Sequence, residues 1–474
     1  MQINRNMSAV VANNQLLGIE ERLSASIERL SSGLKINRAS DNPAGMAISN
    51  KMKAQIDALD QAEANAADGI SVVQIADGAL NEVSSILQRI RELSVQAANG
   101  LTSFNDRQSM QDEVAELVKE VDRISADTEY NTKNLLDGSS NVRIYGEGGS
   151  RYQVTDSVIA RKYMLNVEAA ATSATVELNY DAPTADGTIS INGVLATVTA
   201  GMSKEEYLET VRQAAHEAGC SVEIDTTGMQ DKMFIVSDYF GYEEDITVTM
   251  TEELALAEGF DANAVYSAEE KVYKAHVTGS DAVVTVPTDL TSCGFTTTTT
   301  VECTGNRIVV TDNDGFSIDF LLDEGYNKAA DATNGNFEID VTDIGSLTIQ
   351  IGANEHQTMD VRIDEISAHT LYLDSVDIAV SGGANRALDA LDSAIARVSA
   401  ARSRIGAFQN RLEYAEKSLS ASVENITTAY SGLLDTDMAE EMTEYTQQNI
   451  LNQAAISVLS QANELPQQIL SMLQ

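Results

Sequence analysis

Residues 391–433 have the sequence LDSAIARVSAARSRIGAFQNRLEYAEKSLSASVENITTAYSGL, in which an aliphatic residue recurs at every seventh position. This repeat consists of Leu391, Val398, Ile405, Leu412, Leu419, Ile426 and Leu433. A second seam is partly filled by Leu388, Ile395, Phe408, Val423 and Tyr430. A sustained heptad repeat is typical of helices that wind around one another in a left-handed sense. The stretch therefore predicts one long helix that pairs with another long helix.

The partner helix is predicted near the other end of the chain. From Met52 to Ala97, apolar residues recur at intervals of three and four, or sums of these, which is the pattern of a helix with one apolar stripe. A shorter stripe of the same kind runs from Val114 to Ile124. Because most of the chain separates Ala97 from Leu388, the chain must leave the helical pair and later return to it.

The segment SGLKINRASDNP, residues 32–43, predicts a loop between two helices. Gly33 suits the end of the first helix, since glycine readily adopts the left-handed conformation found there. Asn42 suits the N-cap of the second helix, and Pro43 is tolerated in a first helical turn. We therefore expect a separate helix before this loop and the long helix after it.

The middle of the chain changes to the alternating pattern of strands. GTISINGVLATVTA, residues 187–200, has the Asn-Gly pair of a tight hairpin at Asn192 and Gly193. Residues 203–219 then predict a short helix, with Ser203 and Glu206 forming a capping box. Two strands follow it, which gives a ββαββ unit, and later alternating runs predict a second stretch of antiparallel sheet.

These patterns predict an α+β fold, in which both ends of the chain form a long helical coiled-coil bundle and a β-rich region is inserted between them. The expected terminal helices are 1–43 and 435–474. The expected bundle domain, which includes β-hairpin segments, is 44–165 and 345–434. The β-rich outer region is expected at 166–344.

Charge restricts the partners of this chain. Acidic residues number 72 and basic residues 31, so the formal charge is −41. The stretch 166–345 has 33 acidic and 7 basic residues, a net of −26, and so contains most of this charge. Such a surface is unsuited to nucleic acid or to an anionic membrane. The sequence has neither a membrane-spanning apolar run nor an apolar signal segment at its start, so we expect a soluble chain without a cleavable signal peptide.

The outermost helices have weak apolar stripes. The residues that form them, and that we expect to mediate assembly, are Ile3, Met7, Val10, Leu17, Met442, Tyr445, Ile456 and Leu459. The 57 residues after Lys417 contain no Lys or Arg, so charge pairs within this last stretch are absent. Helices of this kind are marginal alone. They are better suited to packing against copies of the same chain.

Candidate catalytic and metal sites are weak. His216 and Glu217 begin a zinc-protease pattern, but the position that needs a second histidine is Cys220. Asp312–Gly315 resembles the start of a calcium loop that lacks its later glutamate. We therefore expect no catalytic residue, no metal, no cofactor and no enzyme activity.

The three cysteines are Cys220, Cys293 and Cys303, and an odd number prevents complete intramolecular pairing. A bridge between Cys293 and Cys303 would require two strands to bring them together. The sequence alone does not decide whether Cys293 and Cys303 form a disulfide or remain free thiols.

Both ends of the chain closely resemble bacterial flagellins. At the amino-terminal end the resemblance is carried by SGLKINRASDNPAGMAIS at 32–49 and LQRIRELSVQAANG at 87–100. At the carboxyl-terminal end it is carried by SRIGAFQNRLEYA at 403–415 and NILNQAAISVLSQANELPQQILSMLQ at 449–474. TIQIGAN at 348–354 is also similar to the segment that returns to the helical domain in that family.

The resemblance implies a structural subunit that self-assembles into the flagellar filament for swimming motility. It implies that the terminal helices form the inner tube of the filament and that the insert points outward. The implied location is extracellular, after passage through the flagellar export apparatus with the help of its chaperone. Implied partners are other copies of the chain and the filament cap and junction proteins. Alternative hypotheses are a hook–filament junction protein and a flagellin with a peptidase-like insert.

The resemblance also implies recognition by a Toll-like receptor of animal innate immunity. The matching receptor-contact residues are Arg89 and Leu93 in LQRIREL and Glu113 in MQDEVAEL. An alternative interpretation assigns Leu93 to the apolar stripe of the bundle, and Arg89 and Glu113 to ordinary surface contacts.

Overall fold

The structure is a computed structural model that describes residues 6–472, except 156, 226–230, 242–244, 259, 261–263, 268–270, 288–292, 297, 327–335 and 343. The chain divides into two compact units. The first comprises residues up to Ile70, Ile349–Met359 and the residues from Asn410 onward. The second comprises Ser71–Thr348 and Asp360–Gln409.

Four helices contribute to the first unit. They are α1 (Met7–Ser32), α2 (Pro43–Ala97), α6 (Gly383–Leu434) and α7 (Met438–Met472), of which α2 and α6 also contribute to the second unit. The prediction of two long helices is confirmed, because α2 has 55 residues and α6 has 52. In the first unit these two helices share a small core of Leu59, Ala62, Ala66 and Leu419.

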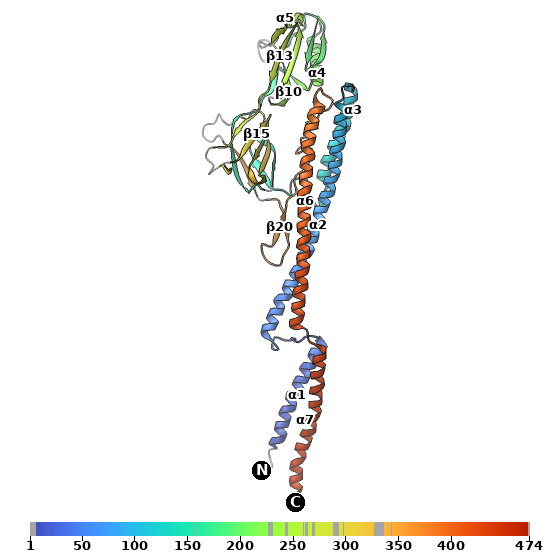
Figure 1. Ribbon diagram of the computed structural model, residues 1–474, viewed down its shortest axis with the longest axis vertical. Helices are drawn as coiled ribbons and strands as arrows, with labels where there is room; N and C mark the ends of the chain where they lie inside the picture. Colours follow the sequence, from blue (N-terminus) through green and yellow to red (C-terminus); the bar gives the residue numbers. More distant parts are fainter. Residues whose placement is uncertain are drawn as a thin grey trace. The chain divides into compact units, whose positions relative to one another are not determined.

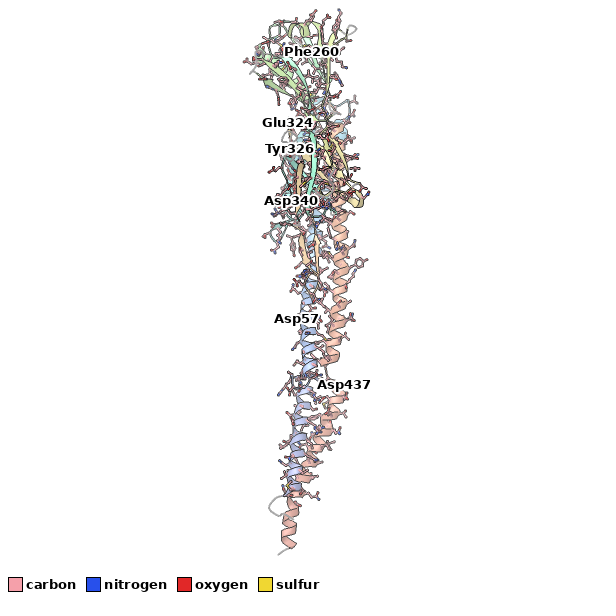
Figure 2. All side chains as sticks on the ribbon, turned by 90° about the vertical axis from the view of Figure 1, so that its left-hand side faces the viewer. Asp57, Phe260, Glu324, Tyr326, Asp340 and Asp437 are labelled. Carbon is pink, nitrogen blue, oxygen red and sulfur yellow. The ribbon has the colours of Figure 1, made fainter. Side chains whose placement is uncertain are left out.

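The predicted end of α1 and the predicted start of α2 are confirmed. Gly33 has a φ of 71° and its N–H donates to the carbonyl of Arg29, which ends α1. The side chain of Asn42 accepts from the N–H of Gly45 at 2.9 Å and caps α2. The α7 cap is Asp437, whose carboxylate accepts from the N–H of Ala439 at 2.8 Å (Figure 2).

The helical part of the second unit contains portions of α2 and α6 together with α3 (Phe104–Asp127). The heptad residues Leu391, Val398 and Ile405 are buried here. Ion pairs at the edges of the two long helices join Arg91 to Asp392 at 2.8 Å and Arg402 to Asp77 at 2.9 Å. Buried apolar seams flanked by such pairs are typical of a coiled-coil contact.

The second unit also contains two β-rich cores (Figure 1). The first core lies between a four-stranded sheet of order β14-β5-β18-β3 and another of order β15-β16-β17-β4. Phe320 and Phe337 stack at its centre, with ring centroids 5.0 Å apart. These strands are β3 (Arg143–Gly146), β4 (Gly149–Val154), β5 (Arg161–Ala169), β14 (Val283–Thr285), β15 (Thr300–Thr304), β16 (Arg307–Thr311), β17 (Ser317–Leu322) and β18 (Asn336–Thr342).

The second β-rich core combines a five-stranded sheet of order β12-β13-β11-β7-β8 with a three-stranded sheet of order β6-β10-β9. Its helix α4 (Lys204–Glu217) buries Tyr207, Val211 and Ala215, and the predicted Ser203 capping box is present. The strands are β6 (Ser173–Asn179), β7 (Gly187–Ile191), β8 (Val194–Val198), β9 (Cys220–Asp225), β10 (Lys232–Phe240), β11 (Asp245–Thr251), β12 (Val265–Ser267) and β13 (Val272–Thr278).

The described residues also form several short elements. They are β1 (Glu129–Tyr130), β2 (Lys133–Asn134), α5 (Glu252–Glu258), the short 3-10 helix η1 (Asn313–Gly315), β19 (Leu347–Gln350) and β20 (Thr358–Val361). Strands β19 and β20 form a two-stranded sheet. Across the described residues, no helix is both long enough and apolar enough to cross a membrane.

Three features of the structure differ from the predictions made from sequence patterns or were left open by them. Strand β5 runs across the boundary expected at 165/166, because its burial alternates continuously from Tyr163 to Val167 against β14 and β18. The ββαββ order is present, but its hairpins β7–β8 and β9–β10 lie in different sheets. Cys220, Cys293 and Cys303 are all free thiols in the structure, so it contains no bridge between Cys293 and Cys303.

Candidate functional site on the terminal helices

Helices α1 and α7 leave large apolar side chains in solvent. Met7, Val10 and Leu17 of α1 and Met442 and Ile456 of α7 are each at least 50% exposed. Other exposed apolar side chains on these helices are Val11, Ile27, Met438, Ile450, Leu451 and Val458. So many exposed large apolar side chains are typical of a protein interaction surface. We call these residues together the terminal apolar surface.

The other sequence candidates for assembly fall in different environments. Tyr445 and Leu459 of α7 are half-buried, so part of each side chain is still accessible. Ile3 lies outside the described residues. The structure therefore places Met7, Val10, Leu17, Met442 and Ile456 on the terminal apolar surface.

Among the side chains that the structure describes on α1 and α7, the fully buried ones are polar or small. Within the described part of α1, the one fully buried residue is Ser26. On α7 the buried residues include Glu441, Gln448 and Ala462. Large apolar side chains such as Leu23, Leu30 and Leu459 are only half-buried, whereas in an ordinary soluble helix pair they are inside.

Contacts along the two helices hold them antiparallel, side by side (Figure 1). Near the loop that follows α1, the N–H of Lys35 donates to the carbonyl of Leu434, and the N–H of Thr436 donates to that of Gly33 at 3.0 Å. At the far end, Nδ2 of Asn6 donates to the carbonyl of Ala462 at 2.8 Å. Between these ends, Nη1 of Arg29 lies 3.3 Å from Oε2 of Glu441.

The three receptor-contact candidates lie in the second unit. Nη2 of Arg89 on α2 lies 2.7 Å from Oε1 of Glu113 on α3, and its Nη1 lies 3.2 Å from Oε2 of Glu92. The hydrogen bond with Glu113 raises the pKa of Arg89 above its usual value. Leu93 is buried in the apolar stripe of α2. The structure thus brings Arg89 and Glu113 together on an exposed face and turns Leu93 inward.

The weak metal candidates are separated or already hydrogen-bonded. His216 is exposed near the end of α4, whereas Cys220 is buried on β9. The Asp312 carboxylate accepts from the hydroxyls of Thr296 and Thr298, which lower its pKa to about 2. No group of three or more His, Cys, Asp or Glu side chains suited to a metal occurs in the part of the chain that the structure describes.

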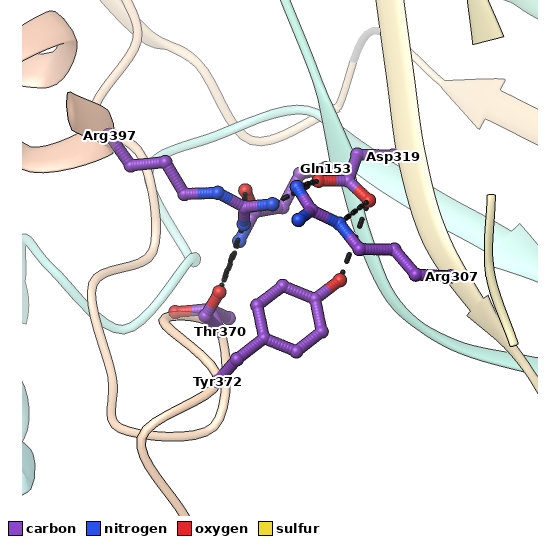
Figure 3. Close-up of polar contacts among 6 residues, drawn as sticks. All are labelled: Gln153, Arg307, Asp319, Thr370, Tyr372 and Arg397. Carbon is purple, nitrogen blue, oxygen red and sulfur yellow. Dashed lines mark hydrogen bonds and ion pairs between the residues drawn. The ribbon is translucent and has the colours of Figure 1, made fainter. Parts of the chain in front are cut away.

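A polar cluster in the second unit was not predicted from the sequence (Figure 3). It consists of Gln153, Arg307, Asp319, Thr370, Tyr372 and Arg397, and we call it the Asp319 cluster. Its residues other than Tyr372 help to line a cavity of about 320 Å³. The one local signal for it is an aspartate within the apolar strand sequence FSIDFLL at 316–322, since a charged residue is rarely buried without a partner.

Asp319 is the centre of this cluster. Its carboxylate accepts from Nε and Nη2 of Arg307 at 3.2 and 2.8 Å, and from Nη2 of Arg397. The hydroxyl of Tyr372 donates to it at 3.4 Å, and burial raises the pKa of that phenol. Arg397 also donates to the carbonyl of Thr370 at 3.0 Å. The cluster therefore connects strands β16 and β17 to helix α6 through one shared carboxylate.

Two family models match the ends of the chain. The model described as the bacterial flagellin N-terminal helical region matches residues 3–141, and the bacterial flagellin C-terminal helical region matches residues 388–473. A flagellin of Clostridium tyrobutyricum is 33% identical over 470 residues, which cover 98% of this chain and 100% of the relative. A flagellin of Salmonella typhimurium strain LT2 is 32% identical over 510 residues, which cover 99% of each chain.

A solved structure described as FliC from Burkholderia pseudomallei also aligns with the chain. It is 22% identical, covers 72% of this chain and 99% of its own, and has a TM-score of 0.24.

Proposed function

The chain belongs to the bacterial flagellin family and is a structural subunit of the flagellar filament, and from this premise we propose that α1 and α7 make its contacts with neighbouring copies. The observation that carries this proposal is the terminal apolar surface, which the rest of the described chain leaves uncovered. A second copy of the same helices would cover it with apolar side chains of the same kind.

The size of this surface is sufficient to drive association. Complete burial of a large aliphatic side chain contributes about 1.5–3 kcal/mol, so a residue that is already half-buried in the monomer has about half of that gain remaining. Several such residues occur on each helix, and each of them repeats in every copy. Their sum offsets the loss of translational and rotational freedom on association.

Growth from filament seeds tests this proposal. We expect the purified chain to elongate seeds into long filaments visible by electron microscopy, whereas a hook–filament junction protein should not elongate them. The double variant Val10→Gln, Ile456→Gln should raise the critical concentration for growth by about tenfold or more, since about 1.4 kcal/mol corresponds to a factor of ten.

The control for this experiment is Leu256→Gln on α5, which removes an apolar side chain that is more exposed than Val10 or Ile456 but lies in the inserted region. It should leave the critical concentration unchanged. Equal growth by the control and the double variant would contradict the assignment of assembly to α1 and α7.

Recognition by a Toll-like receptor is a second proposed property, and Arg89 and Glu113 are its candidate contacts. Their side chains are adjacent and about half exposed, so a partner is able to reach both. We expect Arg89→Ala to reduce signalling in receptor reporter cells at least about tenfold, because a charge-assisted contact contributes about 1.5–3 kcal/mol. Lys119→Ala, on an exposed part of α3, is the control. Unchanged signalling by the Arg89 variant would count against this role.

The filament lies outside the cell, and the remaining proposed partners follow from that location. We propose that the chain reaches the filament tip through the flagellar export apparatus with a dedicated chaperone. At the tip it would meet the cap protein, and at the base of the filament the junction proteins. Weak helices such as α1 and α7 suit passage in an unfolded state, since little stability must be overcome.

A further inference from the structure

We infer that the ion pair between Arg29 and Glu441 selects α7 as the partner of α1 and fixes which faces of the two helices meet. The inference rests on the proposed role of these helices in assembly, and it adds the residues that determine their pairing. The most exposed apolar side chains, such as Val10 and Ile456, contribute little to this pairing. Half-buried ones such as Leu23 and Tyr445 contribute apolar contact, but none of the large apolar side chains described on either helix is fully buried. The fully buried residues described on these helices are polar or small, and Glu441 is the one among them that carries a charge.

The geometry supports this assignment. Glu441 is buried, and its Oε2 lies 3.3 Å from Nη1 of Arg29, while Oε2 of Glu444 lies 4.0 Å from the same nitrogen. Oε1 of Glu441 has no hydrogen-bond partner among the described residues. A buried carboxylate with one cation nearby depends strongly on that cation, because its own hydration is lost.

The charges of the two helices make the pairing specific. Helix α7 contains Glu440, Glu441, Glu444 and Glu464 but no Lys or Arg, whereas α1 contains Arg22 and Arg29 together with Glu20, Glu21 and Glu28. Two copies of α7 in contact through this face would bring carboxylates together without any cation. An α1–α7 pair brings Arg29 to Glu441. The same charges therefore favour the α1–α7 pair over a pair of two α7 helices.

The ion pair also determines the rotation of α7 about its own axis. The backbone hydrogen bonds from Lys35 to Leu434 and from Thr436 to Gly33 hold the ends of the helices together at the loop. Successive helical residues are separated by about 100°, so a different face of α7 would remove Glu441 from Arg29 and turn the terminal apolar surface inward. Correct rotation keeps that surface outside, where a second copy is able to bind it.

Charge reversal tests this inference in the full-length chain. Arg29→Glu should raise the critical concentration for growth from wild-type seeds by about tenfold or more. The charge-swapped variant Arg29→Glu, Glu441→Arg should recover growth to within about threefold of the unmodified chain. Arg22→Glu is the matched control, since it makes the same charge change on α1 at an exposed residue. It should grow like the unmodified chain.

Two results would overturn the inference. The first is growth of the Arg29→Glu chain equal to that of the Arg22→Glu chain. The second is recovery of growth on mixing the Arg29→Glu chain with a separate Glu441→Arg chain, because the contact would then be between copies. Failure of this inference is distinguishable from failure of the proposed function. If the Val10→Gln, Ile456→Gln chain does not grow but the Arg29→Glu chain does, only the pairing role is lost.

Discussion

Removal of residues 438–474 is expected to abolish polymerisation and to leave the β-rich cores folded. The deletion removes all of α7, and with it half of the terminal apolar surface and the helix that pairs with α1. Neither β-rich core contains a residue of α7, so the buried areas that stabilise those cores are unchanged. We expect no filaments by electron microscopy, and a thermal unfolding transition of the sheets that matches that of the full chain by circular dichroism.

Removal of residues 1–35 provides the companion experiment. It deletes α1 and keeps α7, yet it should have the same effect, because each helix holds the other in position. Growth of either shortened chain from seeds would show that the terminal helices are not the polymer contacts. Loss of the sheet transition in either chain would show instead that the terminal helices are needed for folding of the second unit.

Asp319→Ala is expected to destabilise the second unit by about 3 kcal/mol. Removing one partner of a buried ion pair typically costs about 3–5 kcal/mol, and the lower value applies because Arg307 is one-third exposed. The variant leaves Arg307 and Arg397 close together without the carboxylate that they share, and Tyr372 loses its acceptor. Chemical denaturation followed by circular dichroism measures the change in the free energy of unfolding.

The control for this change is Glu324→Ala (Figure 2), which removes one negative charge from an exposed position of the same unit. It should alter the free energy of unfolding by less than about 0.5 kcal/mol, as is usual at surface positions. A loss of stability equal in the two variants would mean that net charge, rather than the Asp319 cluster, accounts for the effect.

The helices could be predicted from sequence because their signals are local. The heptad from Leu391 to Leu433 predicts α6, and the apolar stripe from Met52 to Ala97 predicts α2. The ends of helices and strands could also be predicted where one residue determines the backbone conformation. Gly33 adopts the left-handed conformation, and Asn192 and Gly193 have φ values of 48° and 86°, as the tight turn between β7 and β8 requires.

The sheets could be predicted only as individual strands. The alternation of residues 161–169 is visible in the sequence, but nothing local shows that β5 pairs with β14 and β18, which lie far along the chain. For the same reason, the sequence did not place the two hairpins of the ββαββ unit in different sheets. Strand partners are selected by long-range packing, which leaves no periodic mark on either strand.

The sequence by itself determined the kinds of element, their ends, the paired long helices and the weak terminal stripes, because each depends on residues within a few positions of one another. Only the tertiary structure decided which polar residues meet. It joined Asp319 to Arg397 and Arg29 to Glu441 across long separations in the chain, and Asp319 to Arg307 across two neighbouring strands. The sequence does not show whether a charged side chain faces solvent or a partner. Burial is what makes a partner necessary, because a buried charge loses its hydration.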